Sequence, residues 1–206
     1  TALGSGYWLV TPLRLADGRL GYTLGGRSGH LVEENRAVLL KDLVSELFPT
    51  LTETQAGHVL YRMKLTPELT ARALFRLKAE LQTLRNDLEH WVARPVWSQQ
   101  AVGPQVLVST EVKHAMSQAL LRAWRRQSDT VHFGEHTGYE LNLKAWPVDV
   151  LPELSADFAH ISSLRLSNSL SGKFPSGFLQ KFHNVRALTL ANSHLAELPS
   201  EISSLT

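Results

Sequence analysis

Two histidines four residues apart are the first residues in this sequence whose spacing could do chemistry. His132 and His136 lie in the run His-Phe-Gly-Glu-His, and zinc-binding helices also place two histidines at this interval. The zinc pattern, however, needs a glutamate directly after the first histidine and a helix beneath both. Here Phe133 and Gly134 follow, in a segment that we expect to be a loop. The remaining histidines are scattered, and we predict no metal site and no cofactor.

Other catalytic chemistries find no support in the sequence. The glycines between Gly21 and Gly29 lack the Gly-Lys-Ser/Thr end of a phosphate-binding loop. The chain contains 0 cysteines, which excludes disulfides, thiolate zinc sites and a cysteine nucleophile. We therefore predict no catalytic residues in this sequence, and whether a longer parent protein is an enzyme stays open.

The composition is that of an ordinary globular protein. Of 206 residues, 43% are hydrophobic and 19% are charged, and the net charge is +2. So small a charge does not favour nucleic acid as a partner. No apolar run approaches the ~20 residues that span a bilayer. The chain opens without a methionine or a signal-peptide pattern and closes inside a repeat, so we expect a segment of a longer protein.

A repeat in the last third of the chain carries most of the functional information. Leu141, Leu164 and Leu188 are equivalent leucines, 23 and then 24 residues apart. Each begins a Leu-x-Leu pair, and Leu-Pro or Phe-Pro follows ten residues after the first leucine. This period and motif are typical of leucine-rich repeats, in which each copy supplies one short parallel strand and a return segment. Stacked copies bury their leucines together and leave a curved sheet open to a partner.

The side chains that flank the strand leucines should face that open sheet. Equivalent positions on neighbouring parallel strands then form ladders, of which Asn142, Arg165 and Thr189 are one example. Tyr and Arg are enriched at binding hot spots, so Tyr139, Arg165 and Arg186 are the expected anchors. A solvated face without a ligand is the alternative. The predicted partner-binding residues are Tyr139, Glu140, Asn142, Lys144, Arg165, Asn168, Arg186, Thr189 and Asn192.

The elements that position this face follow from the pattern of apolar residues. An alternating pattern around Asp17-Gly18 predicts a β-hairpin, and helical periodicity then predicts three helices up to Arg94. We expect an α+β chain whose last part is an α/β solenoid. The predicted parts are a hairpin remnant of an upstream region (1–30), a helical bundle (31–94), a linker (95–109), a capping helix and loop (110–136), and three leucine-rich repeats, the last incomplete (137–206).

A helix directly before the repeats has the position of an N-terminal cap. Thr110 is its expected N-cap, and its apolar stripe is formed by Val112, Met116, Leu120 and Trp124. Such a stripe can cover the first leucine layer, because the raw end of a repeat stack otherwise exposes it. We expect no corresponding cap at Thr206, and therefore self-association or fraying at that edge.

The stretch from Leu120 through Leu166 resembles large bacterial leucine-rich-repeat effectors. The resemblance lies in Leu-Leu-Arg-Ala-Trp-Arg-Arg from Leu120, Gly-Tyr-Glu-Leu-Asn-Leu from Gly138, and Ser-Leu-Arg-Leu from Ser163. It is closest to the novel-E3-ligase (NEL) and dermonecrotic-toxin-like family. The family likeness implies a helical cap, repeats that select a host protein, and a separate C-terminal domain that transfers ubiquitin through a cysteine. No residue here matches that cysteine.

These observations predict a protein-binding fragment of a secreted virulence effector. The partner would be a host protein, reached in the host cytoplasm, and ubiquitin with its E2 enzyme would bind only through a domain absent from this chain. The parent would then be an E3 ubiquitin ligase. The alternative is a non-enzymatic leucine-rich-repeat protein that serves adhesion or scaffolding.

Overall fold

The computed structural model describes residues 13–14, 20–21, 28–98, 104–147, 150–167, 175 and 177–191. These residues form a mixed α and β fold, which confirms the predicted α+β class. The chain divides into two compact units, Thr1–Arg76 and Leu77–Thr206, and the division falls inside a helix. Each unit is described by itself.

The first unit begins with the predicted antiparallel strands. β1 (Leu13–Arg14) pairs with β2 (Leu20–Gly21), while the expected turn at Asp17-Gly18 lies outside the described residues. In α1 (Ser28–Leu47), Leu40, Val44 and Leu47 are buried, at the spacing of one helical face.

Two helix starts in this unit are set by threonine. The Thr52 hydroxyl accepts from the Gln55 N–H while the Gln55 side chain accepts from the Thr52 N–H, a capping box that opens α2 (Glu53–Met63). The Thr66 hydroxyl accepts from the Leu69 N–H at 3.4 Å, directly before α3 (Pro67–Ala93), which begins with a proline.

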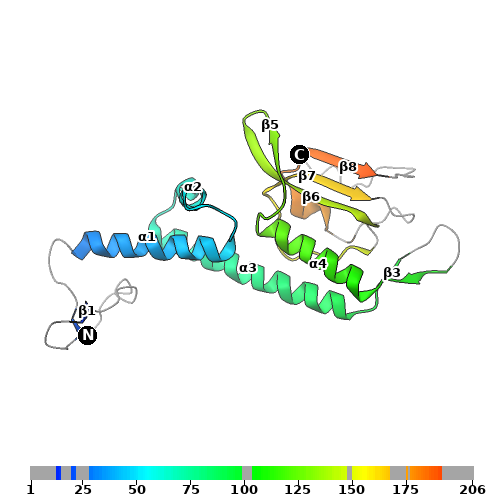
Figure 1. Ribbon diagram of the computed structural model, residues 1–206, viewed down its shortest axis with the longest axis horizontal. Helices are drawn as coiled ribbons and strands as arrows, with labels where there is room; N and C mark the ends of the chain where they lie inside the picture. The colour runs from blue at the N-terminus through cyan, green and yellow to red at the C-terminus, as the bar shows by residue number, and fades with distance from the viewer. Residues whose placement is uncertain are drawn as a thin grey trace. The chain divides into compact units, whose positions relative to one another are not determined.

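In the second unit, the C-terminal half of α3 lies beside α4 (Thr110–Trp124) (Figure 1). Glu80 of α3 accepts a hydrogen bond from the Trp124 indole N–H at 3.0 Å. The buried Lys113 ammonium donates to the carbonyls of Val92 and Arg94, each at 2.6 Å, so a positive charge closes the C-terminus of α3.

The cap of α4 differs by one residue from the prediction. Ser109, not Thr110, is the N-cap, because its extended backbone lets its hydroxyl accept from the Val112 N–H at 3.3 Å. The expected stripe is buried at Met116, Leu120 and Trp124, whereas Val112, at its N-terminal end, is exposed. Between α3 and α4, the segment read as a linker or loose strand contains a short antiparallel pair, β3 (Trp97–Ser98) with β4 (Val106–Leu107).

The segment between α4 and residue 136 was expected to be a loop, and that prediction is wrong for residues 130–133, which form a strand. β5 (Thr130–Phe133) and the start of β6 (His136–Pro147) form an antiparallel hairpin around Gly134, whose φ of 61° suits glycine. Val131 and Phe133 alternate with polar neighbours, and this alternation was the overlooked sign of a strand.

The main sheet has the order β5-β6-β7-β8. β6, β7 (Ile161–Ser167) and β8 (Ala187–Ala191) run parallel (Figure 1). Leu141 pairs with Leu164 and Leu164 with Leu188, so the equivalent leucines lie side by side on adjacent strands.

The core of this unit lies behind the leucine rows. Leu141, Leu143, Leu164 and Leu166 are at most 2% exposed, whereas Leu188 and Leu190 are only partly buried. Between β7 and β8 the chain returns through the short 3-10 helix η3 (Leu179–Phe182). Its Phe182 packs against Phe158 and Phe178, each pair of rings 5.2 Å apart between centroids. The return segments therefore supply aromatic bulk beneath the strands.

A close approach between β6 and β7 requires glycine at position 138. A Cβ on Gly138 would overlap the buried side chain of Ser162, so we expect Gly138→Ala to lower the free energy of unfolding by about 2–3 kcal/mol. Denaturant unfolding measures this change. Gly57→Ala is the matched control, since a Cβ there meets nothing within 4 Å, and it should be neutral or stabilising.

Removing the opposing side chain should relieve the overlap. The double variant Gly138→Ala/Ser162→Gly is therefore expected to recover part of the lost stability, although it also loses the hydrogen bond from His136 to Ser162. A double variant that is less stable than the sum of the two single changes would contradict this account.

Candidate binding surface

One face of the β6–β8 sheet presents polar side chains between the buried leucines. Asn142 pairs with Arg165, and Arg165 with Thr189, so these residues form the ladder expected from the sequence. Asn142 and Thr189 are exposed and Arg165 is partly exposed. Because side chains alternate along a strand, the same pairing that buries the leucines holds this ladder outward. We call Glu140, Asn142, Arg165 and Thr189 the polar face.

An ion pair fixes two side chains of the polar face. The Arg165 guanidinium lies 3.5 Å from one carboxylate oxygen of Glu140, and the Ser163 hydroxyl donates to the other at 3.1 Å. The Glu140 side chain is 18% exposed, so this pair is partly shielded from water. Both partners are thereby held in one orientation before any ligand arrives.

Other predicted binding residues lie differently. Tyr139 is half-buried, with its ring edge against His160 at 5.9 Å, and is not part of the polar face. Lys144 is half-buried on β6, and its N–H donates to the Asn142 side chain at 3.2 Å. Arg186 is exposed one residue before β8, where its N–H bonds to Ser162. Asn168 and Asn192 lie outside the described residues.

The two histidines with zinc-like spacing bind different partners. His132 contacts the Thr137 hydroxyl across the hairpin at 3.0 Å, and His136 contacts the Ser162 hydroxyl at 3.0 Å. Within the described ranges, no three His, Cys, Asp or Glu side chains are grouped as a metal site would require.

His160 joins the end of α4 to the sheet. Its Nε2 donates to the Ala123 carbonyl at 2.7 Å, and its ring stacks on Phe158. Burial lowers the pKa of His160 to about 4, against the opposing effect of the Ala123 hydrogen bond. The half-buried ring is therefore neutral at pH 7.

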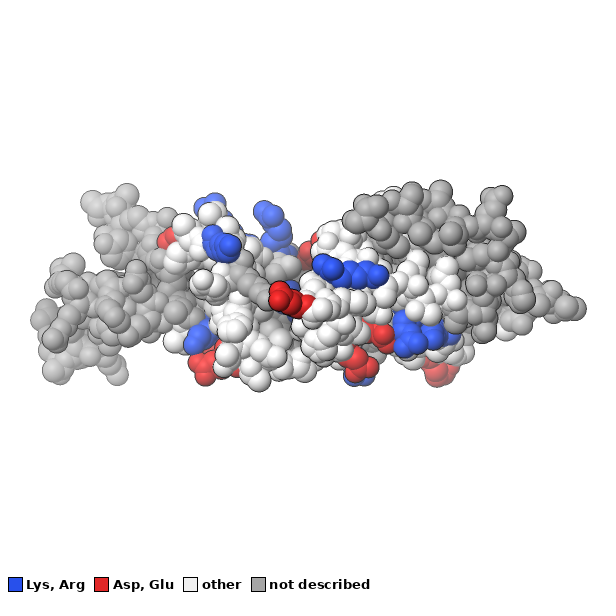
Figure 2. Space-filling model, turned by 90° about the horizontal axis from the view of Figure 1, so that it is seen from above, with Lys and Arg blue, Asp and Glu red and all other residues white. Residues whose placement is uncertain are grey.

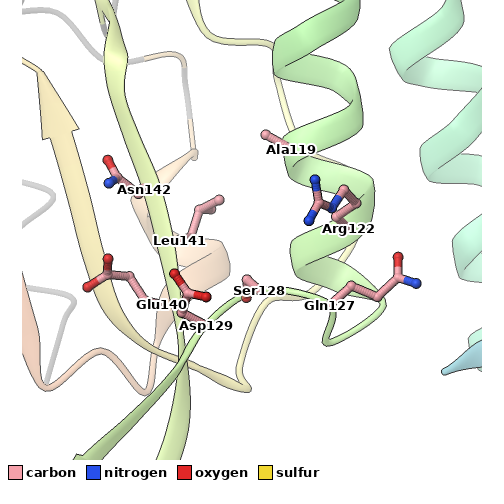
Figure 3. A pocket seen from close by; sticks show the side chains of 8 residues that line it. All are labelled: Ala119, Arg122, Gln127, Ser128, Asp129, Glu140, Leu141 and Asn142. Carbon is pink, nitrogen blue, oxygen red and sulfur yellow. The ribbon is translucent and has the colours of Figure 1, made fainter. Parts of the chain in front are cut away.

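A pocket of about 200 Å³ lies between α4 and β6 (Figure 3). Arg122 reaches from α4 toward the strand, while the Glu140 and Asn142 side chains point to the other side of β6. The Ser128 hydroxyl oxygen is buried without a hydrogen-bond partner in the described part of the chain. The lining residues are Ala119, Arg122, Gln127, Ser128, Asp129, Glu140, Leu141 and Asn142.

The sequence analysis did not predict this pocket, because it took the segment of β5 for a loop. Arg122 is exposed and lines this pocket. The hairpin brings Asp129 to β6, where its carbonyl accepts the Glu140 N–H at 2.8 Å. Recognising the alternation at Val131 and Phe133 would have located one wall of the pocket.

The comparisons with known proteins identify no relative. No family model matches the chain, and neither a curated protein nor a solved structure matches it. Among the helices that the structure describes, none has the length and hydropathy to cross a membrane. On the face shown in Figure 2, the visible Lys and Arg side chains form separate small groups interspersed with acidic and uncharged residues.

The lowered pKa of His160 predicts a pH-dependent stability. With an ordinary pKa of 6.5 in the unfolded chain and about 4 in the fold, the unfolded state binds the additional proton between these values. The free energy of unfolding should therefore be fully retained above pH 6.5 and fall by about 2–3 kcal/mol as the pH drops to 4.

His160→Gln isolates this contribution. Glutamine retains an N–H donor for the Ala123 carbonyl but does not titrate. Denaturant unfolding of both proteins between pH 4 and 7.5 should show a shallower decline for the variant. Parallel stability profiles for the two proteins would refute the assignment.

Proposed function

We propose that residues 137–191 are the capped beginning of a leucine-rich-repeat array and that its polar face binds another protein. The supporting observation is the register of Leu141, Leu164 and Leu188, which are 23 and 24 residues apart in sequence yet adjacent in the sheet. Each intervening segment returns to start the next parallel strand, as a repeat requires. The hairpin strand β5 and helix α4 serve as the N-terminal cap.

The chemistry of the polar face suits a protein partner. Asn142 and Thr189 offer neutral hydrogen-bonding groups, and Arg165 adds a positive charge oriented by Glu140. An oriented arginine loses less side-chain freedom on binding than a free one, so it is suited to be an anchor. The 200 Å³ pocket beside it is smaller than the pockets of about 300 Å³ or more that hold small molecules.

We extend the proposal to the parent protein on the resemblance between residues 120–166 and the bacterial NEL and dermonecrotic-toxin-like effectors. The repeats would select a host protein in the host cytoplasm. A separate C-terminal domain would transfer ubiquitin to it through a cysteine. Residues 137–191 would contribute the recognition of that protein.

Substitution of the polar face tests the binding proposal. A photo-crosslinking residue at exposed Thr189 is used to capture and identify a partner from host-cell extract. The purified partner's dissociation constant is then measured against Asn142→Ala and Arg165→Ala. We expect each change to weaken binding about tenfold or more, because each removes a central contact.

Gln180→Ala is the matched control for these variants. Gln180 is exposed on η3, outside the polar face, and its replacement should leave the dissociation constant unchanged. A partner whose affinity is unaffected by both Asn142→Ala and Arg165→Ala does not use this face, and the proposal then fails.

The parent's activity has a separate test. The gene is sequenced beyond the codon for Thr206, and the full protein is incubated with E1, E2, ATP and labelled ubiquitin. We expect ubiquitin chains that disappear when the cysteine of the downstream domain is changed to alanine. A parent without ubiquitin transfer refutes the ligase proposal and leaves the binding proposal standing.

A further inference from the structure

The edge of β6 beyond its hairpin with β5 is open in the described structure. β5 pairs with residues His136–Tyr139 only, while β6 continues to Pro147. Two hydrogen bonds show toward which neighbouring strand the backbone N–H groups of β6 point. The Tyr139 N–H donates to His160 on the β7 side, and the Glu140 N–H donates to Asp129 on the β5 side.

Because backbone groups alternate along a strand, the N–H and C=O of Asn142 face the same edge as those of Glu140. The next group on that edge is already satisfied, since the Lys144 N–H donates to the Asn142 side-chain oxygen. This leaves one donor and one acceptor at Asn142, and the Glu140 carbonyl, along the open edge.

These groups border the pocket between α4 and β6 (Figure 3). Its opposite wall carries the small side chain of Ala119 and the Arg122 guanidinium, and the buried Ser128 hydroxyl lacks a partner in the described residues. Backbone donors and acceptors in a row at a strand edge are the complement of another extended backbone.

We propose that this edge binds a short extended peptide segment of a protein partner by strand addition opposite Asn142. One peptide residue forms the paired N–H and C=O bonds with Asn142, while the Arg122 side chain binds a neighbouring carbonyl group. Asp129 balances the charge of Arg122 in the lining, so the geometry favours a neutral peptide backbone over an inorganic anion.

The site is distinct from the polar face proposed above. It uses the backbone of Glu140 and Asn142 at the strand edge, whereas the polar face uses their side chains. Each can therefore be blocked without altering the other.

The test uses the 206-residue chain with ¹⁵N-labelled backbone amides. The probe is a library of acetylated and amidated tetrapeptides, randomised at each position without proline. We expect a saturable shift of the Asn142 amide signal, and no shift with the same library N-methylated at its peptide bonds, because N-methylation removes the ligand's donors.

Ala119→Trp fills the pocket and should weaken binding at least tenfold, while Gln118→Trp adds the same bulk at an exposed position on α4 and should not. Ala119→Leu repeats the test with less added volume if the Trp variant does not fold. Equal shifts with the N-methylated library, binding unchanged in the folded Ala119 variants, or no saturable shift at all would overturn the proposal. So would a saturable shift at Asn142 produced by inorganic phosphate in place of the peptides.

Discussion

The lateral alignment of leucines across β6, β7 and β8 is the constraint on which the second unit depends. Leu141, Leu164 and Leu188 occupy equivalent places on neighbouring strands, and the next row repeats this with Leu143, Leu166 and Leu190. A shift of one residue in any strand would exchange its buried and exposed side chains. The aromatic side chains of the return segments and the polar face are therefore both positioned by a single register.

Polar contacts, in addition to the leucine rows, hold the elements of the second unit together. The Lys113 ammonium donates hydrogen bonds to two carbonyls at the C-terminal end of α3. Glu80 accepts hydrogen bonds from both the Trp124 indole N–H and the Asp157 backbone N–H. Each of these groups would be costly to bury alone, and each has found a partner from a different segment. Together they hold α3, α4 and the chain before β7 in one arrangement, and α4 can then form a wall of the pocket.

The sequence predicted the features that depend on local pattern or on period. The three helices before Arg94, the leucine rows of the sheet and the ladder of Asn142, Arg165 and Thr189 follow from spacing alone. Other features depend on contacts that spacing does not encode. Ser162 and Ser163 are buried where the pairing of β6 and β7 is irregular, near Tyr139 and Glu140. Tyr139 is half-buried because its ring packs against His160. The pocket is lined by residues directly before β5, a four-residue strand whose alternating pattern was overlooked.

The β5–β6 hairpin also has a consequence for the order in which the sheet assembles. Its strands are separated by the two residues Gly134 and Glu135, whereas β7 and β8 must each close a loop of more than a dozen residues to reach their neighbours. The entropy lost on closing a loop rises with its length, so the hairpin is the strand pairing in this sheet that loses the least entropy on forming. It offers a nucleus on which the parallel strands can add one after another, and the chain thereby avoids searching for both distant pairings at once.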